Sequence, residues 1–243
     1  KSLENIDRFS SDLYIFWNLS KSLISNREAT EARTNRILNA NYGKADLDAY
    51  VKEYDQLDSE QRDSLTKLLR KYETLFDGTL GKWKREPVSL RLKPNAKLCQ
   101  SRPFSVPHFH QETLKKEIQR LVDIGVLRKK PGARYSSPSF IIPKKDQTVR
   151  FVSDFRKVNQ ELDRAPFPTP KIKDLLESLA GFQWVSAIDL NMGYYHIELD
   201  PYAQEVCTIV FPWGKYSYNR LPMGIACAPD IFQNEMESLM EEL

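Results

Sequence analysis

The sequence predicts an α+β fold, in which short helices alternate with β-hairpins along the chain. Helices are indicated by apolar residues at helical spacing between capping residues, and hairpins by apolar runs joined through short polar turns. From about residue 111 these signals follow in the order helix, hairpin, helix, strand, hairpin, helix. No internal repeat is visible, so a mixed architecture of this class is expected.

The first 55 or so residues are weakly patterned, apart from a short apolar cluster at 13–17. This composition favours a tether, and a separate domain is the alternative. A helix is expected from Asp58, which can cap it with Gln61 as the reciprocal partner, and Gly78 follows as a closing residue. The apolar face of this helix consists of Leu65, Leu68, Leu69, Tyr72, Leu75 and Phe76.

The middle of the chain is predicted to hold extended chain, two helices and a hairpin. Residues 87–107 carry several prolines and read as extended chain on a surface. Helices are expected at about 111–124, closed by Gly125, and at about 171–179, stopped by Gly181. Between them, strands at 139–143 and 149–154 form a hairpin with a basic tip at 144–148.

A mostly apolar strand at 184–189 is expected next, and residues 195–199 alternate. Asp200 and Pro201 provide a cap and a first-turn proline for a short helix, and a second hairpin pairs 207–211 with 215–220. The last helix starts near Pro229 and presents Ile231, Phe232, Met236, Leu239 and Met240. It has no stop signal and the chain starts at Lys1, so a chain cut at both ends is expected.

Bulk composition excludes several classes of protein. An apolar fraction of 41% and a charged fraction of 28% are typical of a globular protein. The net charge of +3 is too small to indicate a nucleic-acid partner, so any basic surface must be local. Three dispersed cysteines argue against a disulfide framework or a zinc module. There is no signal-peptide pattern and no apolar run of about 20 residues, so no membrane partner is expected.

Asp189 is the first candidate for chemistry, because it ends a buried, β-rich run where a charge is costly unless it is paired or binds a metal. Taken alone, it is better explained as a turn aspartate. Its neighbours change that balance, since Asn191, Gly193, Tyr194 and Tyr195 predict a tight turn with backbone donors and an aromatic edge. A carboxylate beside such donors suits a nucleoside triphosphate and its metal.

Three segments around Asp189 resemble the motifs of Ty3/gypsy-class reverse transcriptases. Residues 186–197, Ser-Ala-Ile-Asp-Leu-Asn-Met-Gly-Tyr-Tyr-His-Ile, resemble the first palm motif. Pro-Lys-Lys-Asp at 143–146 with 149–159 is similar to the fingers motif, and 218–225 with 228–233 resembles the third block. The resemblance covers residues 58–243 and implies a right-hand polymerase fold, with fingers at about 85–163 and 197–227 and an incomplete palm at 164–196 and 228–243. Residues 1–57 would be a partly helical connector of the polyprotein.

The resemblance also implies roles for single residues. Asp189 would be the catalytic ligand of two Mg²⁺ ions, for which Mn²⁺ is a substitute, and the carbonyl of Leu190 would contact the second ion. Tyr194 would be the steric gate that excludes a 2′-hydroxyl. The remaining nucleotide-binding residues would be Lys144, Arg150, Asn191, Met192, Gly193, Met223 and Gly224. Asp154 and Arg156 would pair or position the template, and Phe232 and Gln233 would lie on the palm helix behind the pocket.

One part of the family pattern is missing from the sequence. The polymerase needs a Tyr-x-Asp-Asp hairpin, and no Asp-Asp dipeptide occurs in the 243 residues. One aspartate cannot hold two Mg²⁺ ions roughly 4 Å apart, so these residues alone are expected not to polymerise. The expected partners are dNTP, a primed RNA or DNA template, and the rest of a Pol polyprotein with its palm, thumb and RNase H.

Two other functions are alternatives. An RNA-dependent RNA polymerase is disfavoured because Tyr194 would block the 2′-hydroxyl that such an enzyme must accept. The second alternative is a decayed or repurposed fragment that binds nucleic acid without catalysis. The sequence does not exclude this function, because such a fragment would keep all three motifs. The family implies an intracellular, cytoplasmic location, with nuclear access as an alternative.

Overall fold

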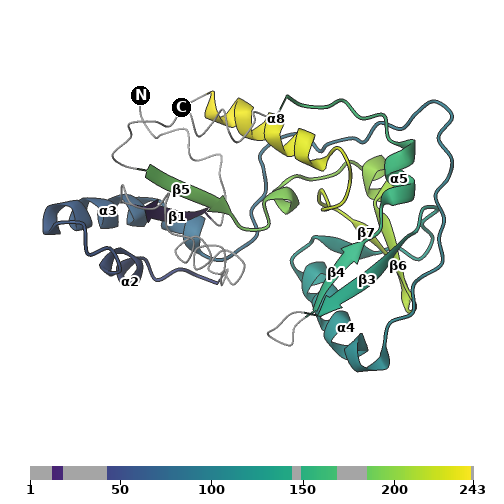
Figure 1. The fold of residues 1–243 in the computed structure, drawn as a ribbon, viewed down its shortest axis with the longest axis horizontal. Helices are drawn as coiled ribbons and strands as arrows, with labels where there is room; N and C mark the ends of the chain where they lie inside the picture. The colour runs from purple at the N-terminus through teal and green to yellow at the C-terminus, as the bar shows by residue number, and fades with distance from the viewer. Residues whose placement is uncertain (1–12, 19–42, 144–148, 169–184, 242–243) are drawn as a thin grey trace, which may run out of the picture. The chain divides into compact units, whose positions relative to one another are not determined.

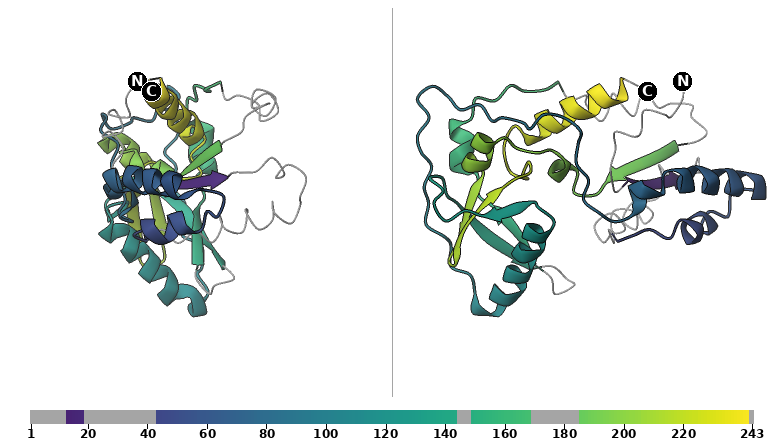
Figure 2. Two further views of the ribbon diagram at one scale, coloured as in Figure 1. Left: turned by 90° about the vertical axis from the view of Figure 1, so that its left-hand side faces the viewer. Right: turned by 180° about the vertical axis from the view of Figure 1, so that it is seen from behind.

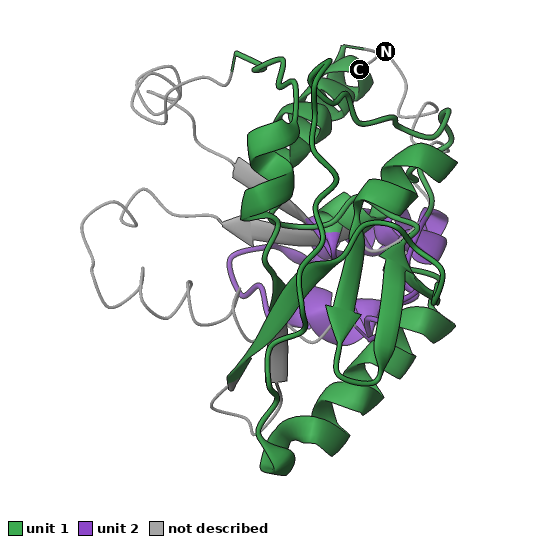
Figure 3. Cartoon of the chain, turned by 90° about the vertical axis from the view of Figure 1, so that its right-hand side faces the viewer, with its two compact units in different colours: residues 1–6, 82–169, 193–243 green, residues 7–81, 170–192 purple. Residues whose placement is uncertain are grey.

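The computed structural model describes residues 13–18, 43–143, 149–168 and 185–241, with backbone alone for 13–18, 143, 149–151 and 185–189. Contacts divide the chain into two compact units, coloured separately in Figure 3. Unit 1 comprises residues 1–6, 82–169 and 193–243, and unit 2 comprises residues 7–81 and 170–192. Both contain helices and antiparallel strands, which confirms the predicted α+β class (Figure 1).

The elements are labelled as in Figure 1. Those of unit 2 are β1 (Leu13–Asn18), α2 (Leu47–Lys52), α3 (Ser59–Lys71), the 3₁₀ helix η2 (Glu73–Phe76) and β5 (Val185–Leu190). Those of unit 1 are α4 (His108–Asp123), β2 (Leu127–Lys129), β3 (Ser137–Pro143), β4 (Val149–Ser153), α5 (Arg156–Glu161), the 3₁₀ helix η3 (Gly193–His196), α7 (Pro201–Val206), β6 (Thr208–Phe211), β7 (Gly214–Tyr218) and α8 (Ala228–Met240).

Helix α3 has the predicted start. The Gln61 N–H donates to Asp58 Oδ1 at 2.8 Å, and the Asp58 N–H donates to Gln61 Oε1 at 3.1 Å, which completes the capping box. Its end differs from the prediction, because the chain leaves the α-helical region at Tyr72 and continues as η2 before Gly78 at φ +81°. The tighter turn buries Leu75 and Phe76, while Leu68 is exposed rather than inward as predicted.

Helix α2 was not expected from the sequence. Asp46 caps it by accepting the Ala49 N–H at 3.0 Å, and Leu47 and Val51 are buried where α2 packs on α3. A guanidinium–carboxylate pair, Arg70 Nη2 to Asp48 Oδ2 at 2.6 Å, joins the two helices. Six residues are too few to show helical periodicity, so the sequence pattern did not predict this helix.

The predicted domain boundary at residue 57 stays a prediction, and contacts do not divide the chain there.

Unit 1 contains a five-stranded sheet in the order β2-β7-β6-β3-β4. Both predicted hairpins are confirmed, since β3 pairs antiparallel with β4 from Ser139↔Ser153 to Pro143↔Val149, and β6 pairs antiparallel with β7. The tip at 144–148 lies outside the described residues. A short parallel ladder, with Ser137 opposite Ile209, joins the two hairpins into one sheet.

The core of unit 1 lies between this sheet and α4, which contacts β2 and β4 and runs beside the strands in both views of Figure 2. The helix starts three residues earlier than predicted and ends, as expected, before Gly125. The inward residues of α4, the first residue of β2 and the central strand β6 supply side chains with almost no exposed surface, including Leu114, Ile118, Leu121, Leu127, Ile209 and Phe211. A fully buried leucine or phenylalanine side chain contributes about 1.5–3 kcal/mol.

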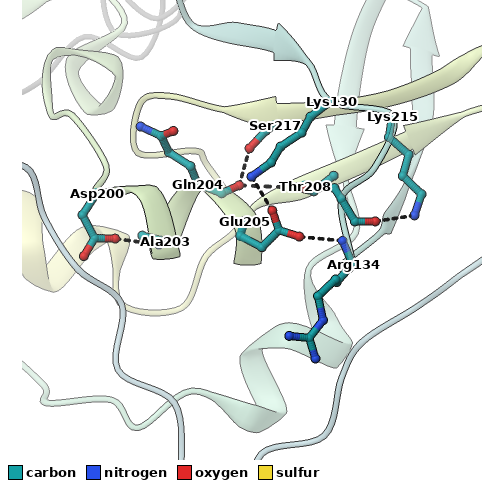
Figure 4. A network of polar contacts seen from close by, with 10 residues as sticks. Lys130, Arg134, Asp200, Ala203, Gln204, Glu205, Thr208, Lys215 and Ser217 are labelled. Carbon is teal, nitrogen blue, oxygen red and sulfur yellow. Dashed lines mark hydrogen bonds and ion pairs between the residues drawn. The ribbon is translucent and has the colours of Figure 1, made fainter.

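Helix α7 anchors the turn between β2 and β3 (Figure 4). Its predicted cap is present, with Asp200 accepting the Ala203 N–H at 2.6 Å. Glu205 accepts the Arg134 N–H at 2.5 Å and pairs with the Lys130 ammonium. Burial disfavours the Glu205 carboxylate, but these donors outweigh it and hold its pKa below the usual range. Lys215 Nζ donates to Ala133 O at 2.8 Å and fixes the turn from the β7 side.

Other predicted segments have mixed outcomes. Residues 87–107 are extended, with isolated bridges such as Val88↔Leu199, until α4 begins at His108. The final helix α8 is confirmed, whereas the helix expected at 171–179 lies outside the described residues. The alternating stretch 195–199 is partly η3, followed by single-residue bridges at Glu198 and Leu199. Among the described helices, none is long and apolar enough to span a membrane.

The capping box of α3 gives a first prediction. Replacing Asp58 with Ala removes the acceptor for the Gln61 N–H, so Asp58→Ala should lower the free energy of unfolding of this unit by about 1 kcal/mol. Urea denaturation followed by far-UV circular dichroism measures the change. Asp63→Ala, on the exposed side of the same helix, is the control and should leave stability within about 0.5 kcal/mol. Equal losses in the two variants would contradict a capping role.

Candidate active site

Strand β5 carries two of the predicted metal ligands, Asp189 and Leu190. It pairs antiparallel with β1, in a register that sets Tyr14 opposite Asp189 and Leu13 opposite Leu190. The backbone of both candidates therefore belongs to a two-stranded ladder in unit 2. The side chain of Asp189 lies outside the described part of the structure, while Leu190 is half-buried.

A tight turn follows β5, as the sequence predicted. Asn191 is fully buried, and Met192 has a φ of +49°, the left-handed region that costs a non-glycine residue about 1–2 kcal/mol. The chain then enters η3, whose first two residues are Gly193 and Tyr194. This turn is also where unit 2 ends and unit 1 resumes.

Tyr194 belongs to a cluster of three aromatic rings within unit 1. Its half-buried ring meets the ring of Phe232 edge-to-face, with centroids 5.2 Å apart and planes at 74°. The other partner of Phe232 is Trp83, at 6.1 Å and 88°. The Trp83 backbone N–H donates to His196 O at 2.9 Å, which ties this segment to η3. Each such ring pair adds about 0.5–1.5 kcal/mol beyond area burial, so the position of the Tyr194 ring is well defined.

The Met223–Gly224 turn is held by one amide side chain. Asn159 Nδ2 donates to Gly224 O at 2.8 Å, and the Ala226 N–H donates to Asn159 Oδ1 at 2.9 Å. Gly224 has a φ of +93°, and a Cβ there would lie 3.4 Å from Ser153 O, so both the backbone angle and the space favour glycine. Met223 and Gly224 are both exposed, so the turn presents backbone and a thioether side chain to solvent.

Asp154 and Arg156, the predicted template-positioning residues, form a local bidentate pair. Arg156 Nε and Nη2 each donate to the Asp154 carboxylate at 2.8 Å, and the Arg156 backbone N–H adds a third bond at 3.1 Å. The Arg156 guanidinium holds the pKa of Asp154 below its usual range. Asp154 is 12% exposed and Arg156 is 84% exposed, so the cation remains open to solvent.

The two basic candidates lie on the first hairpin. The backbone of Arg150 is paired with that of Ile142 near the start of β4, and its side chain is outside the described residues. Lys144 falls in the segment 144–148, which is also outside them. Among described residues, no group of three His, Cys, Asp or Glu side chains is arranged to hold a metal ion.

The structure thus groups the candidates into small clusters. Unit 1 brings Tyr194 against Phe232, Met223 and Gly224 against Asn159, and Asp154 against Arg156. Asp189, Leu190, Asn191 and Met192 follow one another in unit 2. Sequence reasoning assigned no role to Trp83, Asn159, Arg164 or Asp230, all of which contact these clusters or the helix behind them. Asn159 and Asp230 lie inside the quoted motifs, whereas nothing local distinguishes Arg164.

Known proteins similar to this chain form one consistent group. Residues 142–243 match the model of the family described as reverse transcriptase (RNA-dependent DNA polymerase). The Pol polyprotein of transposon 412 from Drosophila melanogaster is 31% identical over 153 residues, 60% of this chain and 12% of that protein. The Pol polyprotein of transposon gypsy, from the same fly, is 30% identical over 132 residues, 52% of this chain and 13% of that protein. The chain therefore spans about an eighth of the length of these relatives.

Similar solved structures show the fold. The prototype foamy virus protease–reverse transcriptase, in a mutant form, superposes with a TM-score of 0.70 at 20% identity. The match covers 81% of this chain and 26% of that chain. The foamy viral enzyme in complex with an RNA/DNA hybrid gives a TM-score of 0.69 at 20% identity, covering 82% and 27%. The predicted reverse transcriptase fold is thereby confirmed. Residues 142–243 thus match the reverse transcriptase family model, and the proteins similar to this chain include the Pol polyproteins of retrotransposons, gypsy among them.

Proposed function

We propose that this chain is part of an RNA-directed DNA polymerase, which adds deoxynucleotides to the 3′-hydroxyl of a primer on an RNA or DNA template. The observation that carries the proposal is the path from β5 to η3. Asp189 is the penultimate residue of a paired strand, the left-handed Met192 turns the chain, and Tyr194 follows on a 3₁₀ helix with its ring supported by Phe232. Asp189 and Tyr194, the proposed metal ligand and the proposed wall under the sugar, are five positions apart along the chain.

Mg²⁺ is the proposed metal, and the ligand atoms available at the end of β5 are of the type that it prefers. Mg²⁺ prefers oxygen ligands, and Asp189 and Leu190 offer a carboxylate and a backbone carbonyl. When bound, the ions supply charge neutralisation on the phosphates and a lowered pKa of the primer hydroxyl. Asp189 and Leu190 are a partial donor set, because two-metal sites use more than one carboxylate.

The nucleotide itself is proposed to be bound by residues of the three motif segments. Lys144 and Arg150 are proposed to bind its β- and γ-phosphates, with a point charge and a planar donor fork. Tyr194 is proposed to close the space under the sugar. Asn191, Met192 and Gly193 would contribute the turn beside it. The exposed Met223–Gly224 turn, fixed by Asn159, is proposed to line the pocket, since its glycine lets backbone approach a ligand closely.

The proposed partners follow from the same assignment. A primed template would bind with Asp154 and Arg156 among its positioning residues, and the exposed guanidinium of Arg156 supports this. The remaining palm, thumb and RNase H parts of a Pol polyprotein are proposed as neighbours in the complete protein, in keeping with the length of its relatives. An intracellular location, cytoplasmic with nuclear access as an alternative, is proposed with them.

The metal assignment predicts the effect of one substitution. Asp189→Asn keeps the size of the side chain and removes the charge that a Mg²⁺ ligand needs. In the longest Pol polypeptide that carries these residues, primer extension should fall at least about 100-fold, because metal stabilisation of the transition state amounts to several kcal/mol. The measurement is single-nucleotide extension of a labelled primer on RNA.

Asp163→Asn is the matched control, an exposed aspartate whose side chain is outside every cluster described above, and it should retain activity. Undiminished extension by Asp189→Asn would refute the metal assignment. The alternative function is nucleic-acid binding without catalysis. It would be supported by a polypeptide that binds primed template tightly in filter binding and never extends the primer.

The gate assignment predicts a change in sugar selectivity. Tyr194→Val shortens the wall under the sugar, so the ratio of kcat/KM for dNTP to kcat/KM for rNTP should fall roughly 10- to 100-fold. Tyr194→Phe is the control, because it keeps the ring and its contact with Phe232 and should keep the ratio. Steady-state extension with each nucleotide class measures it. An unchanged ratio in the Val variant would remove the gate role.

A further inference from the structure

Asp230 is a buried carboxylate that no part of the proposed mechanism uses. It is the third residue of α8 and only 6% exposed. Arg164 Nε donates to Asp230 Oδ2 at 2.6 Å and Arg164 Nη2 donates to Oδ1 at 3.1 Å. The Phe167 backbone N–H donates to Oδ1 at 3.0 Å. These three bonds, called the clamp below, join the first turn of α8 to the extended segment 164–167.

The donors of the clamp stabilise the buried Asp230 carboxylate. A carboxylate removed from water is costly unless donors satisfy it, and a bidentate guanidinium is the donor whose planar geometry matches it best. The Arg164 guanidinium, with the Phe167 N–H in addition, holds the pKa of Asp230 below its usual range in spite of burial. The Arg164 side chain is 48% exposed, so it reaches the carboxylate from the solvent side.

The other side of α8 holds the aromatic cluster. Phe232 lies two residues after Asp230, about 200° around the helix, so its ring leaves the helix on nearly the opposite side. That ring contacts Tyr194 at 5.2 Å and Trp83 at 6.1 Å between centroids. One helical turn further along the same side, Glu235 pairs with Arg85 Nε at 3.1 Å.

Helix α8 is therefore held between two segments that are neither helix nor strand. Residues 83–85 hold it through Phe232 and Glu235, and residues 164–167 hold it through Asp230. The clamp acts on the first turn, two residues before Phe232, whose ring supports Tyr194. Without it, α8 would keep the contacts of Phe232 and Glu235 with residues 83–85 and lose those on its opposite side, so Phe232 could shift relative to the Tyr194 ring.

We propose that the Arg164–Asp230 clamp is a positioning device for sugar selectivity: it fixes Phe232 behind Tyr194 and thereby sets how closely the Tyr194 ring approaches the nucleotide sugar. This inference rests on the proposed gate role of Tyr194. Arg164 and Asp230 are positioning residues, since they act through Phe232 and touch no reacting atom. Loss of the clamp should therefore reduce discrimination between sugars more than it reduces the rate with dNTP.

The kinetic test uses three variants of the Pol polypeptide that contains this chain. Asp230→Asn keeps the volume and weakens the pairing, and Arg164→Lys keeps the charge and loses the bidentate geometry. Each variant should lower the ratio of kcat/KM for dNTP to kcat/KM for rNTP roughly 2- to 30-fold. The kcat for dNTP should stay within about 2-fold of the parent. Glu117→Gln is the control, because it breaks another bidentate arginine pair, with Arg120 on the surface of α4, and should change neither quantity.

A double-variant measurement separates positioning from a general loss of stability. If the clamp acts through the gate, Asp230→Asn should add nothing to the relaxed selectivity of Tyr194→Val, because the wall it positions is already absent. Additive losses in the double variant would overturn the proposal. So would single variants that keep the parental ratio, or that lower kcat for dNTP and rNTP equally.

A readout without catalysis distinguishes failure of the clamp from failure of the proposed polymerase. The chain labelled with 3-fluorotyrosine gives a ¹⁹F resonance for Tyr194, assigned as the one lost in Tyr194→Phe. That resonance should shift in Asp230→Asn and Arg164→Lys and stay fixed in Glu117→Gln. An unmoved resonance in both clamp variants would overturn the positioning role even where polymerase activity is found. A shifted resonance, together with a complete Pol polypeptide that shows no polymerase activity, would support positioning and refute the proposed function instead.

Discussion

Several segments of unit 1, residues 82–107 among them, lie outside its helices and long strand ladders, so side chains must satisfy part of their N–H and C=O groups. Buried polar backbone left without partners would cost about 1–3 kcal/mol for each group. Glu205 supplies an acceptor for the Arg134 N–H, Asp230 for the Phe167 N–H and Glu161 for the Lys97 N–H. Asn159 supplies both an acceptor and a donor to the Met223–Gly224 turn and its continuation. The candidate site depends on these hydrogen bonds from side chains to backbone groups that lie outside the strand ladders.

The features that the sequence predicted well are those whose cause is local. The capping box at Asp58, the cap at Asp200 and the two hairpins each depend on residues within a few positions of one another, and all four are present. The end of α3 was placed too late, because periodicity alone cannot show that Tyr72 leaves the α-helical region and tightens the next turn. Helix α2 was not predicted, because its six residues are too few to show helical periodicity.

The features that the sequence could not predict are contacts between residues far apart along the chain. Arg164 and Asp230 lie 66 positions apart, and Asn159 and Gly224 lie 65 apart, so neither pair leaves a periodic signal. Motif resemblance named Tyr194, Met223 and Gly224, but it could not say what fixes them in place. The supporting residues emerge only when the contacts of α8 and of the 223–226 turn are known. Resemblance thus named candidate residues for the site, and the contacts show which residues support them.

The parallel pairing of β3 with β6 has a consequence for how the protein folds. Each hairpin, β3–β4 and β6–β7, closes a short loop and can form early, as can α4. The Ser137↔Ile209 ladder must then close a loop that includes α5, β5 and α7, and long-range pairing of this kind is slow. During synthesis the first hairpin therefore emerges with one edge unpaired until the second has left the ribosome. That edge is where chaperones or premature self-association would act on the nascent chain.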